Sequence, residues 1–255
     1  MPRLFISAEA IKGDRVLLGS DVARHLAGSL RVRAGERISV VDDSRKEHFI
    51  EVISATPHEI QARILDSKTA AGEPSVHVTV IQALAKDGMD MAIDAMVQAG
   101  VSEIRPVLSE RTIARPTEER QGNRLARWQA IAKETAQQAF RAAIPAVRSI
   151  SSLEQALGEV ADSTQLLACV LAPDSKPISE VQLRGERVAL CVGPEGGFGP
   201  RDLGLLRRAD AVFVHLGPRV YRSRLAGAIA ATLLLAGAGE LVEVGQNSES
   251  ADERE

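Results

Sequence analysis

The chain has 255 residues, of which 45% are hydrophobic and 25% charged, so it can build one large domain or two with a sizeable core. Its net charge of −3 does not exclude a polyanion partner, because much of the negative charge lies at one end. Residues 240–255 hold six acidic side chains and one arginine. Without that segment the chain is net positive. Its basic residues concentrate in 101–150 and 201–224, as a nucleic-acid-binding surface requires.

Cysteine usage and hydropathy exclude further classes. Cys169 and Cys191 lie in apolar runs, which is typical of buried small residues, and no spacing of cysteine or histidine fits a metal site. The N-terminal segment lacks the apolar region of a secretory signal. The longest uncharged stretch, Leu225–Gly239, is shorter than the roughly 20 residues that span a bilayer. We therefore expect a soluble, cytoplasmic protein with no membrane or metal partner.

Residues 1–70 are expected to form a small β-rich domain. In one run, Ile60 and Ala62 alternate with Gln61 and Arg63, as in a strand with one buried face. Ser20 or Asp21 can cap a short helix that contains His25. Short strands at this spacing favour a small barrel. The four expected strands are Arg15–Leu18, Arg37–Val41, His48–Ile53 and Glu59–Leu65.

A polar linker at residues 67–75 marks a domain boundary, and an α/β pattern follows over residues 74–245. Apolar residues at helical spacing indicate that its first helix has a core-facing stripe, formed by Met89, Ile93, Met96 and Val97. The first expected elements are a strand at Val76–Leu84, a helix at Met89–Ala99 that ends at Gly100, and a strand at Ser102–Leu108.

The middle of the chain is expected to be a loop and a long helix. Residues 111–122 form the loop, which carries three arginines, and the helix follows at Arg124–Arg141. Trp128 lies on its core-facing side, whereas Gln138 and Arg141 either face solvent or sit over a substrate site. Residues 146–163 have no clear pattern, and residues 246–255 are expected to be a disordered acidic tail.

The most informative stretch is residues 187–235. Two apolar runs predict buried parallel strands, and a third precedes them. In open α/β sheets, loops at the carboxyl ends of such strands bind ligands. The expected order is a strand at Gln165–Leu171, a strand at Val188–Val192, the loop GPEGGFG at 193–199, a helix from Pro200 to Arg208, a strand at Ala211–Leu216, a loop with a basic turn at 217–224, and a helix from Leu225.

Several interpretations of the glycine loop are open. It can be a set of tight turns without a ligand. A dinucleotide fingerprint fails, because the glycine spacing differs from G-x-G-x-x-G and no acidic residue ends the strand at Ala211–Leu216. A phosphate loop fails as well, because no Gly-Lys-Ser/Thr follows. A backbone-lined pocket for a ligand that is not principally a phosphate remains.

Specific motifs then resemble one known family. GPEGGFG at 193–199, LGPRVYR at 216–222 and the small-residue helix after them resemble the RsmE family of ribosomal RNA uridine-N3 methyltransferases, which belongs to the SPOUT class. The similarity extends to GVSEI at 100–104, SER at 109–111, and the helix residues RW at 127–128, IA at 131–132 and QxxR at 138–141. The segment at 25–36 is similar to the family's N-terminal PUA-like RNA-binding domain.

The resemblance implies a fold, a cofactor and partners. It implies a trefoil-knotted, SPOUT-type parallel-sheet methyltransferase domain at 74–245 and a PUA-like β-barrel domain at 1–70. The cofactor is expected to be S-adenosylmethionine, and the substrate 16S ribosomal RNA of the small subunit. A homodimer is also expected, because the Ala- and Gly-rich helix at Leu225–Gly239 permits close approach of two backbones.

The same resemblance assigns roles to individual residues. Arg219 and Arg222 are the candidates for stabilising the charge that develops on the uridine oxygens. Glu195 is either a proton acceptor or, as we expect, a cap for neighbouring amides. The residues expected to line the cofactor site are Leu171, Gly193, Glu195, Gly196, Gly197, Leu216, Gly217, Val220 and Tyr221. The residues expected to contact RNA are Arg24, Arg31, Arg33, Gln138 and Arg141.

Two departures from the family pattern need an explanation. The family's Lys-x-x-Glu helix end is uncharged at residues 95–98, and a family glutamate and threonine are replaced by Arg224 and Leu225. If the two charged positions are neighbours, losing both avoids an unpaired charge. The departures also leave open a non-catalytic RNA-binding protein of the same fold. A nucleotide-cofactor oxidoreductase is the weaker alternative.

Overall fold

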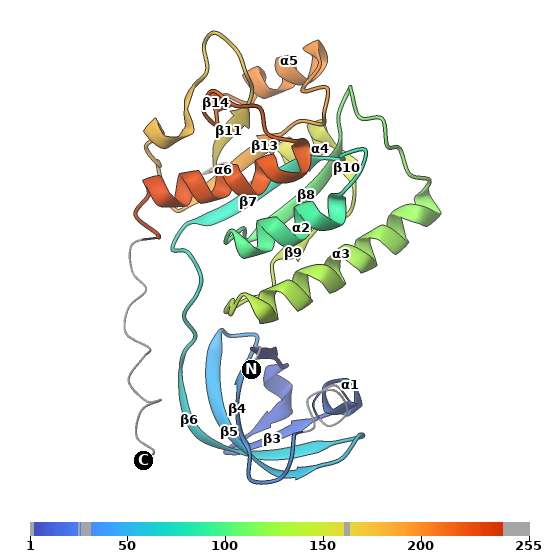
Figure 1. Ribbon diagram of the computed structural model, residues 1–255, viewed down its shortest axis with the longest axis vertical. Coiled ribbons are helices and arrows are strands. Elements are labelled where there is room, and N and C mark those ends of the chain that lie inside the picture. The colour runs from blue at the N-terminus through green and yellow to red at the C-terminus, as the bar shows by residue number, and fades with distance from the viewer. Residues whose placement is uncertain (1–2, 25, 27–31, 161–163, 242–255) are drawn as a thin grey trace. The chain divides into compact units, whose positions relative to one another are not determined.

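The computed structural model describes residues 3–24, 26, 32–160 and 164–241 (Figure 1). The chain divides into two compact units, Met1–Glu73 with Ala130–Pro145, and Pro74–Gln129 with Ala146–Glu255. The expected domains at 1–70 and 74–245 thus differ from these units in residues 130–145, which belong with the N-terminal unit. Their position there has a clear cause, because Glu73 binds Arg141 and Arg3 binds the carbonyl group of Phe140.

The N-terminal unit contains a six-stranded sheet in the order β1-β4-β5-β6-β3-β2. Its neighbouring strands are antiparallel, apart from the parallel pair β1 and β4. The described order is open, so closure into the expected barrel stays a prediction. The strands are β1 (Leu4–Phe5), β2 (Ile11–Lys12), β3 (Arg15–Leu18), β4 (Arg37–Val41), β5 (Lys46–Ala55) and β6 (Ile60–Thr69), and α1 (Ser20–Ala23) follows β3.

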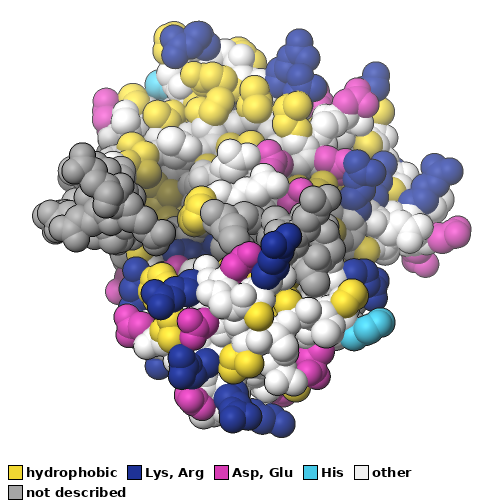
Figure 2. Space-filling view, turned by 60° about the horizontal axis from the view of Figure 1, so that its bottom comes forward, with side chains coloured by type: hydrophobic (Ala, Val, Ile, Leu, Met, Phe, Trp, Pro, Cys, Tyr) yellow, Lys and Arg dark blue, Asp and Glu magenta, His cyan; other side chains and the backbone are white. Residues whose placement is uncertain are grey.

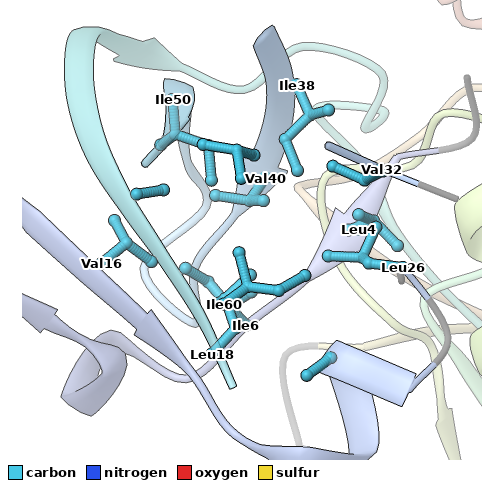
Figure 3. Packing of buried hydrophobic residues seen from close by; sticks show 13 residues of the cluster. Leu4, Ile6, Val16, Leu18, Leu26, Val32, Ile38, Val40, Ile50 and Ile60 are labelled. Carbon is cyan, nitrogen blue, oxygen red and sulfur yellow. The ribbon is translucent and has the colours of Figure 1, made fainter. Parts of the chain in front are cut away.

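One face of this sheet covers a hydrophobic core (Figure 3). The predicted alternation in β6 is confirmed, since Ile60 and Ala62 are buried and Gln61 and Arg63 are exposed. However, β6 continues to Thr69, which pairs with Lys46, so the start of the expected linker is strand. The expected helix does begin at Ser20. His25 and Arg31 lie outside the described residues.

The second unit is built on a parallel sheet in the order β10-β8-β7-β13-β11-β14-β12, with β9 paired to β8. All its pairs are parallel, so the carboxyl ends of the strands share one edge. The strands are β7 (His77–Ala83), β8 (Glu103–Leu108), β9 (Ala146–Val147), β10 (Ser151–Ser152), β11 (Gln165–Cys169), β12 (Lys176–Pro177), β13 (Arg187–Val192) and β14 (Val212–His215). The helices are α2 (Met89–Gln98), α3 (Glu118–Gln138), α4 (Leu153–Gly158), α5 (Pro200–Arg208) and α6 (Ser223–Gly237), of which α3 is divided between the two units.

Helices cover both faces of this sheet. In β7, Ile81 and Ala83 belong to a core that also contains Leu206 of α5 and Ala156 of α4. Val80 and Gln82, on the opposite face, meet Gly227 of α6. Because alternate residues of a strand point to opposite faces, β7 is buried on both sides. Figure 1 shows α2 and α6 side by side, and the small residues of α6 are used in this packing within the chain.

The predicted elements differ from the observed ones mainly around α3. This helix begins at Glu118 within the expected loop and ends at Gln138 before the expected Arg141. Trp128 is buried, as predicted, and its indole N–H donates to Asp90. The region at 146–163 contains β9, β10 and α4, which were not predicted because each is very short. No helix in the described part of the chain is long and apolar enough to span a membrane.

Candidate functional site

Four loops of the second unit leave the same edge of the parallel sheet. They follow β7, β11, β13 and β14, and two of them are the glycine-containing loops at 193–199 and 216–222. In the sheet β13 lies between β7 and β11, and β14 is next to β11. The residues expected to line a cofactor site are therefore at one edge, where parallel strands place their ligand-binding loops.

The loop at 193–199 joins β13 to α5 through a tight turn. Gly197 has a φ of 67°, and its N–H donates to the carbonyl oxygen of Pro194 at 2.9 Å. Gly199 then serves as the N-cap residue of α5, and Pro200 occupies the first turn, where its missing N–H costs nothing. A Cβ atom at Gly197 would meet no atom within 4 Å, so the loop presents backbone to open space there.

Residues from the end of β8 hold this loop in place. The buried Asp202 accepts hydrogen bonds from the N–H groups of Gly199 at 3.2 Å and Glu110 at 2.9 Å. Glu110 in turn accepts from the N–H of Arg201 at 2.9 Å, and Arg111 donates to the carbonyl oxygen of Gly196 at 2.8 Å. We call Glu110, Arg111 and Asp202 the β8 clamp. It satisfies free N–H groups at the start of α5 and holds the carbonyl group of Gly196 in the glycine loop.

The β8 clamp was missed from the sequence. In the sequence, Glu110 and Arg111 belong only to the family-like string SER, and Asp202 lies within the helix expected at Pro200–Arg208. The available signal was the capping pattern in which an acid lies three residues after an N-cap glycine. Nothing in the local pattern connects that acid to residue 110.

Glu195 does accept from a backbone amide, but the amide belongs to another loop and is not a neighbouring one as expected. Both of its carboxylate oxygens accept from the backbone N–H of Lys86, at 3.1 and 3.3 Å. This joins the glycine loop to the loop after β7. Because the carboxylate is engaged in this way, the geometry favours an anchor over a proton acceptor.

The loop after β14 exposes its basic residues. Gly217 has a φ of 100°, a conformation that favours glycine, and a Cβ atom there would meet nothing within 4 Å. Arg219 is exposed and donates to the hydroxyl group of Tyr221 at 3.3 Å. Val220 is 81% exposed. Arg222 is exposed and occupies the N-cap position of α6, which fixes its backbone at the edge of the site.

A buried polar link joins the two glycine loops. Ser223, the first residue of α6, donates from its hydroxyl group to the carbonyl oxygen of Gly193 at 3.0 Å. The same hydroxyl oxygen lies 3.2 Å from the side-chain nitrogen of Gln82, which is fully buried at the end of β7. These two residues were also missed, because a lone serine and a lone glutamine carry no pattern.

The loop after β11 contributes an apolar side chain and no thiolate. Leu171 is 68% exposed. Cys169 and Cys191 are free, and Cys191 is fully buried. Burial raises the pKa of the Cys169 thiol to about 12, so it is protonated at neutral pH and is no nucleophile.

Arg224 does not lie where the departures from the family pattern suggested. Its side chain packs over Gly88, the N-cap residue of α2, where a Cβ atom would approach Cδ of Arg224 to 2.9 Å. Residues 95–98 form the other end of α2. The expected pairing of Arg224 with that helix end is therefore wrong, because the arginine points to the start of the helix.

The residues expected to contact RNA have different environments. Arg24 and Arg33 are exposed, and Gln138 is exposed with its amide 3.4 Å from Glu134. Arg141 is 3% exposed and makes a two-pronged pair with Glu73, at 2.8 and 2.6 Å. The expectation for Arg141 is corrected accordingly, because a guanidinium buried against a carboxylate holds the fold. On the face drawn in Figure 2, Lys and Arg side chains alternate with Asp and Glu rather than forming one basic surface.

Comparison with known proteins agrees with this geometry. Residues 72–235 match the family described as RNA methyltransferase domain, and residues 17–65 match the family described as RNA methyltransferase PUA domain. The chain is 30% identical to Ribosomal RNA small subunit methyltransferase E of Mycobacterium bovis over 225 residues, which cover 86% of this chain and 85% of the relative. It is 27% identical to the protein of the same name in Synechocystis, over 89% of this chain and 75% of that protein.

A solved structure shows the same fold with a cofactor. The chain resembles Ribosomal RNA small subunit methyltransferase E from Neisseria gonorrhoeae, which is bound to S-adenosyl methionine, with a TM-score of 0.83. The two are 29% identical, and the similarity covers 92% of this chain and 97% of that one.

Proposed function

The chain belongs to the family of ribosomal RNA small subunit methyltransferase E, and on this premise we propose that it transfers a methyl group from S-adenosylmethionine to N3 of a uridine in 16S ribosomal RNA. The observation that carries the proposal is the pair of glycine loops at one sheet edge, joined by Ser223 and held by the β8 clamp. The two loops are also the segments that carry the family motifs GPEGGFG and LGPRVYR.

The residues at this edge fit the cofactor. Gly197 and Gly217 leave open space beside backbone groups, as a ligand held by main-chain hydrogen bonds requires. Leu171 and Val220 offer exposed apolar side chains for an adenosine ring. Bound there, S-adenosylmethionine supplies a methyl group already activated by its sulfonium. The protein therefore has to position the nucleophile, which is catalysis by proximity.

The RNA has to present a base that is not paired. N3 of uridine faces its partner in a duplex, so the base is unpaired or flipped out when it reacts. Loss of the N3 proton to water leaves an anion whose charge spreads over the two neighbouring oxygens. N3 then forms a bond to the methyl carbon as the carbon–sulfur bond breaks, and S-adenosylhomocysteine leaves. Arg222 is the group proposed to stabilise the anion, with Arg219 as the second candidate.

We also propose the trefoil knot of the SPOUT class. In support, β11 separates β13 from β14 in the sheet, yet Ser223, eight residues beyond β14, returns to Gly193 and Gln82 on the far side. Pulling single molecules by their termini tests this. A knotted chain extends to a shorter final length than an unknotted chain of 255 residues, and full extension would exclude the knot.

Two measurements test the function. Ribosomal RNA from a strain that lacks the gene should lose one N3-methyluridine of the small subunit, and the intact gene should restore it. Titration calorimetry should show that the purified protein binds S-adenosylmethionine and S-adenosylhomocysteine but not NAD. Binding of NAD alone would favour an oxidoreductase. Cofactor binding with no transfer to small-subunit RNA would favour the non-catalytic RNA-binding alternative.

A further inference from the structure

A cavity of about 440 Å³ lies within the N-terminal unit, apart from the residues that form the loops of the sheet edge. Aromatic, aliphatic and charged side chains line it together, a mixture that a purely structural void does not need. Its lining residues are Arg3, Arg37, Ile38, Ser39, Glu47, Phe49, Leu65 and Phe140. We call it the Phe140 pocket.

Phe140 has an unusual backbone and an unusual exposure. It follows the end of α3 with a φ of 53°, and the N–H of Arg141 donates to the carbonyl oxygen of Ala136 at 3.0 Å. This is a Schellman helix end, in which glycine normally takes the left-handed position. A bulky residue in this conformation is strained. The helix end explains the conformation but not the choice of phenylalanine, whose side chain is 54% exposed.

The neighbouring chain is shaped to hold Phe140 in this position. Arg3 donates from Nη1 to the carbonyl oxygens of Phe140 at 2.5 Å and Ala71 at 2.8 Å. Gly72 has a φ of 108°, and a Cβ atom there would come within 2.6 Å of the Phe140 carbonyl oxygen. Glu73 directly follows Gly72, and Arg141 directly follows Phe140. The ion pair between Glu73 and Arg141 therefore holds the same two segments together. The fold thus fixes an exposed aromatic ring at the pocket.

The inner part of the pocket offers both a donor and an acceptor. The Arg3 side chain is 10% exposed, and its Nε atom is buried with no hydrogen-bond partner among the described residues. The carboxylate of Glu47, 9% exposed, accepts from Ser39 at 2.6 Å and lies 3.4 Å from Nη2 of Arg3. A buried donor without a partner costs free energy unless a ligand satisfies it. Arg37 adds a cation at the rim, with 75% of its side chain exposed.

These features match the chemistry of one nucleotide. A nucleobase has an aromatic face for stacking, donors and acceptors along its edge, and a phosphate beside it. Phe49 is an inferior platform because the ammonium group of Lys68 lies over its ring, 5.0 Å from the centroid. Phe140 makes no such contact in the part of the chain that the structure describes, and its ring is accessible.

We propose that the Phe140 pocket binds one unpaired nucleotide of the RNA substrate. The base stacks on Phe140, its edge meets Arg3 and Glu47, and Arg37 contacts the phosphate. The proposal rests on the proposed function only for the identity of the RNA. We assign the pocket to a nucleotide other than the methylated uridine, and none of the pocket residues belongs to the cofactor loops.

Phe140→Gly tests the pocket cleanly. Glycine is the favoured residue at this backbone position, so the variant should fold, and its melting temperature should not fall. Binding of a fluorescein-labelled single-stranded fragment of small-subunit ribosomal RNA, followed by anisotropy, should weaken about tenfold to a hundredfold, as expected for loss of one stacked base. The salt dependence should stay the same, since no phosphate contact is lost.

Three controls accompany this variant. Phe140→Tyr keeps the ring and should bind RNA as the parent does. Arg37→Ala should lower the salt slope by about one. Ile53→Ala removes a similarly exposed apolar side chain from β5 of the same unit and should have no effect on RNA affinity.

The outcomes separate this proposal from the proposed function. If Phe140→Gly binds RNA with the parent's affinity, the pocket is not a nucleotide site. An unchanged affinity combined with a changed molar mass would reassign Phe140 to a protein interface and also overturn the proposal. If the parent protein fails to methylate but Phe140→Gly weakens RNA binding, the pocket stands and the proposed reaction fails.

Discussion

At the residue scale, the two candidate arginines of the second loop differ in what holds them. Arg219 donates to the Tyr221 hydroxyl group, whereas the Arg222 guanidinium has no hydrogen bond or ion pair within the described residues. The backbone of Arg222 is nevertheless fixed, because its carbonyl oxygen accepts from Leu225 at 2.9 Å and Ala226 at 3.1 Å. An arginine with a fixed backbone and a guanidinium without a partner is suited to bind a group of the substrate.

We therefore expect Arg222→Ala to lose rate rather than affinity. Removing one donor that stabilises a developing oxyanion costs about 100- to 1000-fold in kcat in other enzymes. Single-turnover methylation at saturating RNA should fall by this order, while cofactor affinity and RNA affinity change by a few-fold at most. Arg187→Ala serves as the matched control, because Arg187 is an exposed arginine at the opposite end of β13. A normal rate for Arg222→Ala at saturating RNA would reduce the residue to a positioning contact.

A second residue-scale prediction concerns a buried polar cluster in β5 and its neighbours. Asp42 lies 3.0 Å from Nε2 of His48, and Ser67 lies 2.8 Å from Nδ1 of the same ring. Burial alone would raise the pKa of Asp42, but hydrogen bonds from Ser44, His48 and the amides of Lys46 and Ser44 lower it to about 2. The carboxylate therefore stabilises the folded state above pH 4, and this contribution is lost as the pH falls from about 4 to 2.

The depressed pKa corresponds to about 2 kcal/mol of stability at neutral pH. Asp42→Asn should lower the melting temperature at pH 7 and flatten its decline between pH 4 and 2. Asp43→Asn changes an exposed neighbour and should leave that decline as it is in the parent. Parallel melting curves for the parent and Asp42→Asn over this pH range would contradict the assignment.

At the element scale, the sequence predicts what local pattern determines. The bounds of α2 and α5 follow from apolar spacing, a proline in the first turn and a closing glycine, and both helices lie where they were expected. The elements that were missed, β9, β10 and α4, are too short for periodicity to show. The first six residues of α3 were missed because they include Gly122 and no large apolar side chain.

The candidate site also contains some residues that the sequence predicts and others that it does not. The glycine loops were found from composition, because tight turns and close backbone approach need glycine. The groups that hold them were not found, since Glu110, Gln82 and Lys86 lie far away in sequence and meet the loops only through the order of the parallel strands. For Arg141 the prediction of an RNA contact was wrong, because its burial depends on a partner that is distant in sequence. A polar residue at helical spacing looks exposed until its buried partner, Glu73, is known.

Gly199 provides the element-scale prediction. A Cβ atom at this position would collide with the carboxylate of Glu110, so Gly199→Ala should push that carboxylate away from the N–H of Arg201 at the start of α5. We expect the KM for S-adenosylmethionine to rise at least tenfold, with a smaller change in kcat. Gly204→Ala, within α5, makes only ordinary contact and replaces a poor helix former, so it should raise stability by up to about 1 kcal/mol. Equal KM values for the two variants would show that the clamp does not shape the site.

At the scale of the whole molecule, the small residues of α6 pack within the chain and are not available for a contact between two copies. They were expected to form a dimer contact, but Ala226, Gly227, Ala230 and Ala231 are buried against other elements of the chain. A Cβ atom at Gly227 would approach the Met96 sulfur to 2.9 Å. If the protein is a homodimer, its contact uses other residues, and the exposed residues of α2 and α6 are the candidates.

Each of the two helices carries one exposed apolar side chain in its first turn. Met91, 51% exposed, lies in the first turn of α2, and Leu225, 37% exposed, lies in the first turn of α6. We propose that this surface joins two copies of the chain, in which case each copy brings the start of α6, and with it Arg222, close to its partner. Exposed apolar residues on adjacent helices are what such a contact would cover.

Leu225→Asp tests the dimer. A charge buried in an apolar contact without a partner should weaken the association enough for light scattering at micromolar concentration to report a monomer, where the parent reports a dimer. Ile53→Asp places the same charge at an exposed position of the N-terminal unit and should leave the mass unchanged. Because Leu225 directly follows the start of α6, cofactor affinity has to be measured in the same samples. A monomeric parent would refute the homodimer, and a dimeric Leu225→Asp would move the contact to another surface.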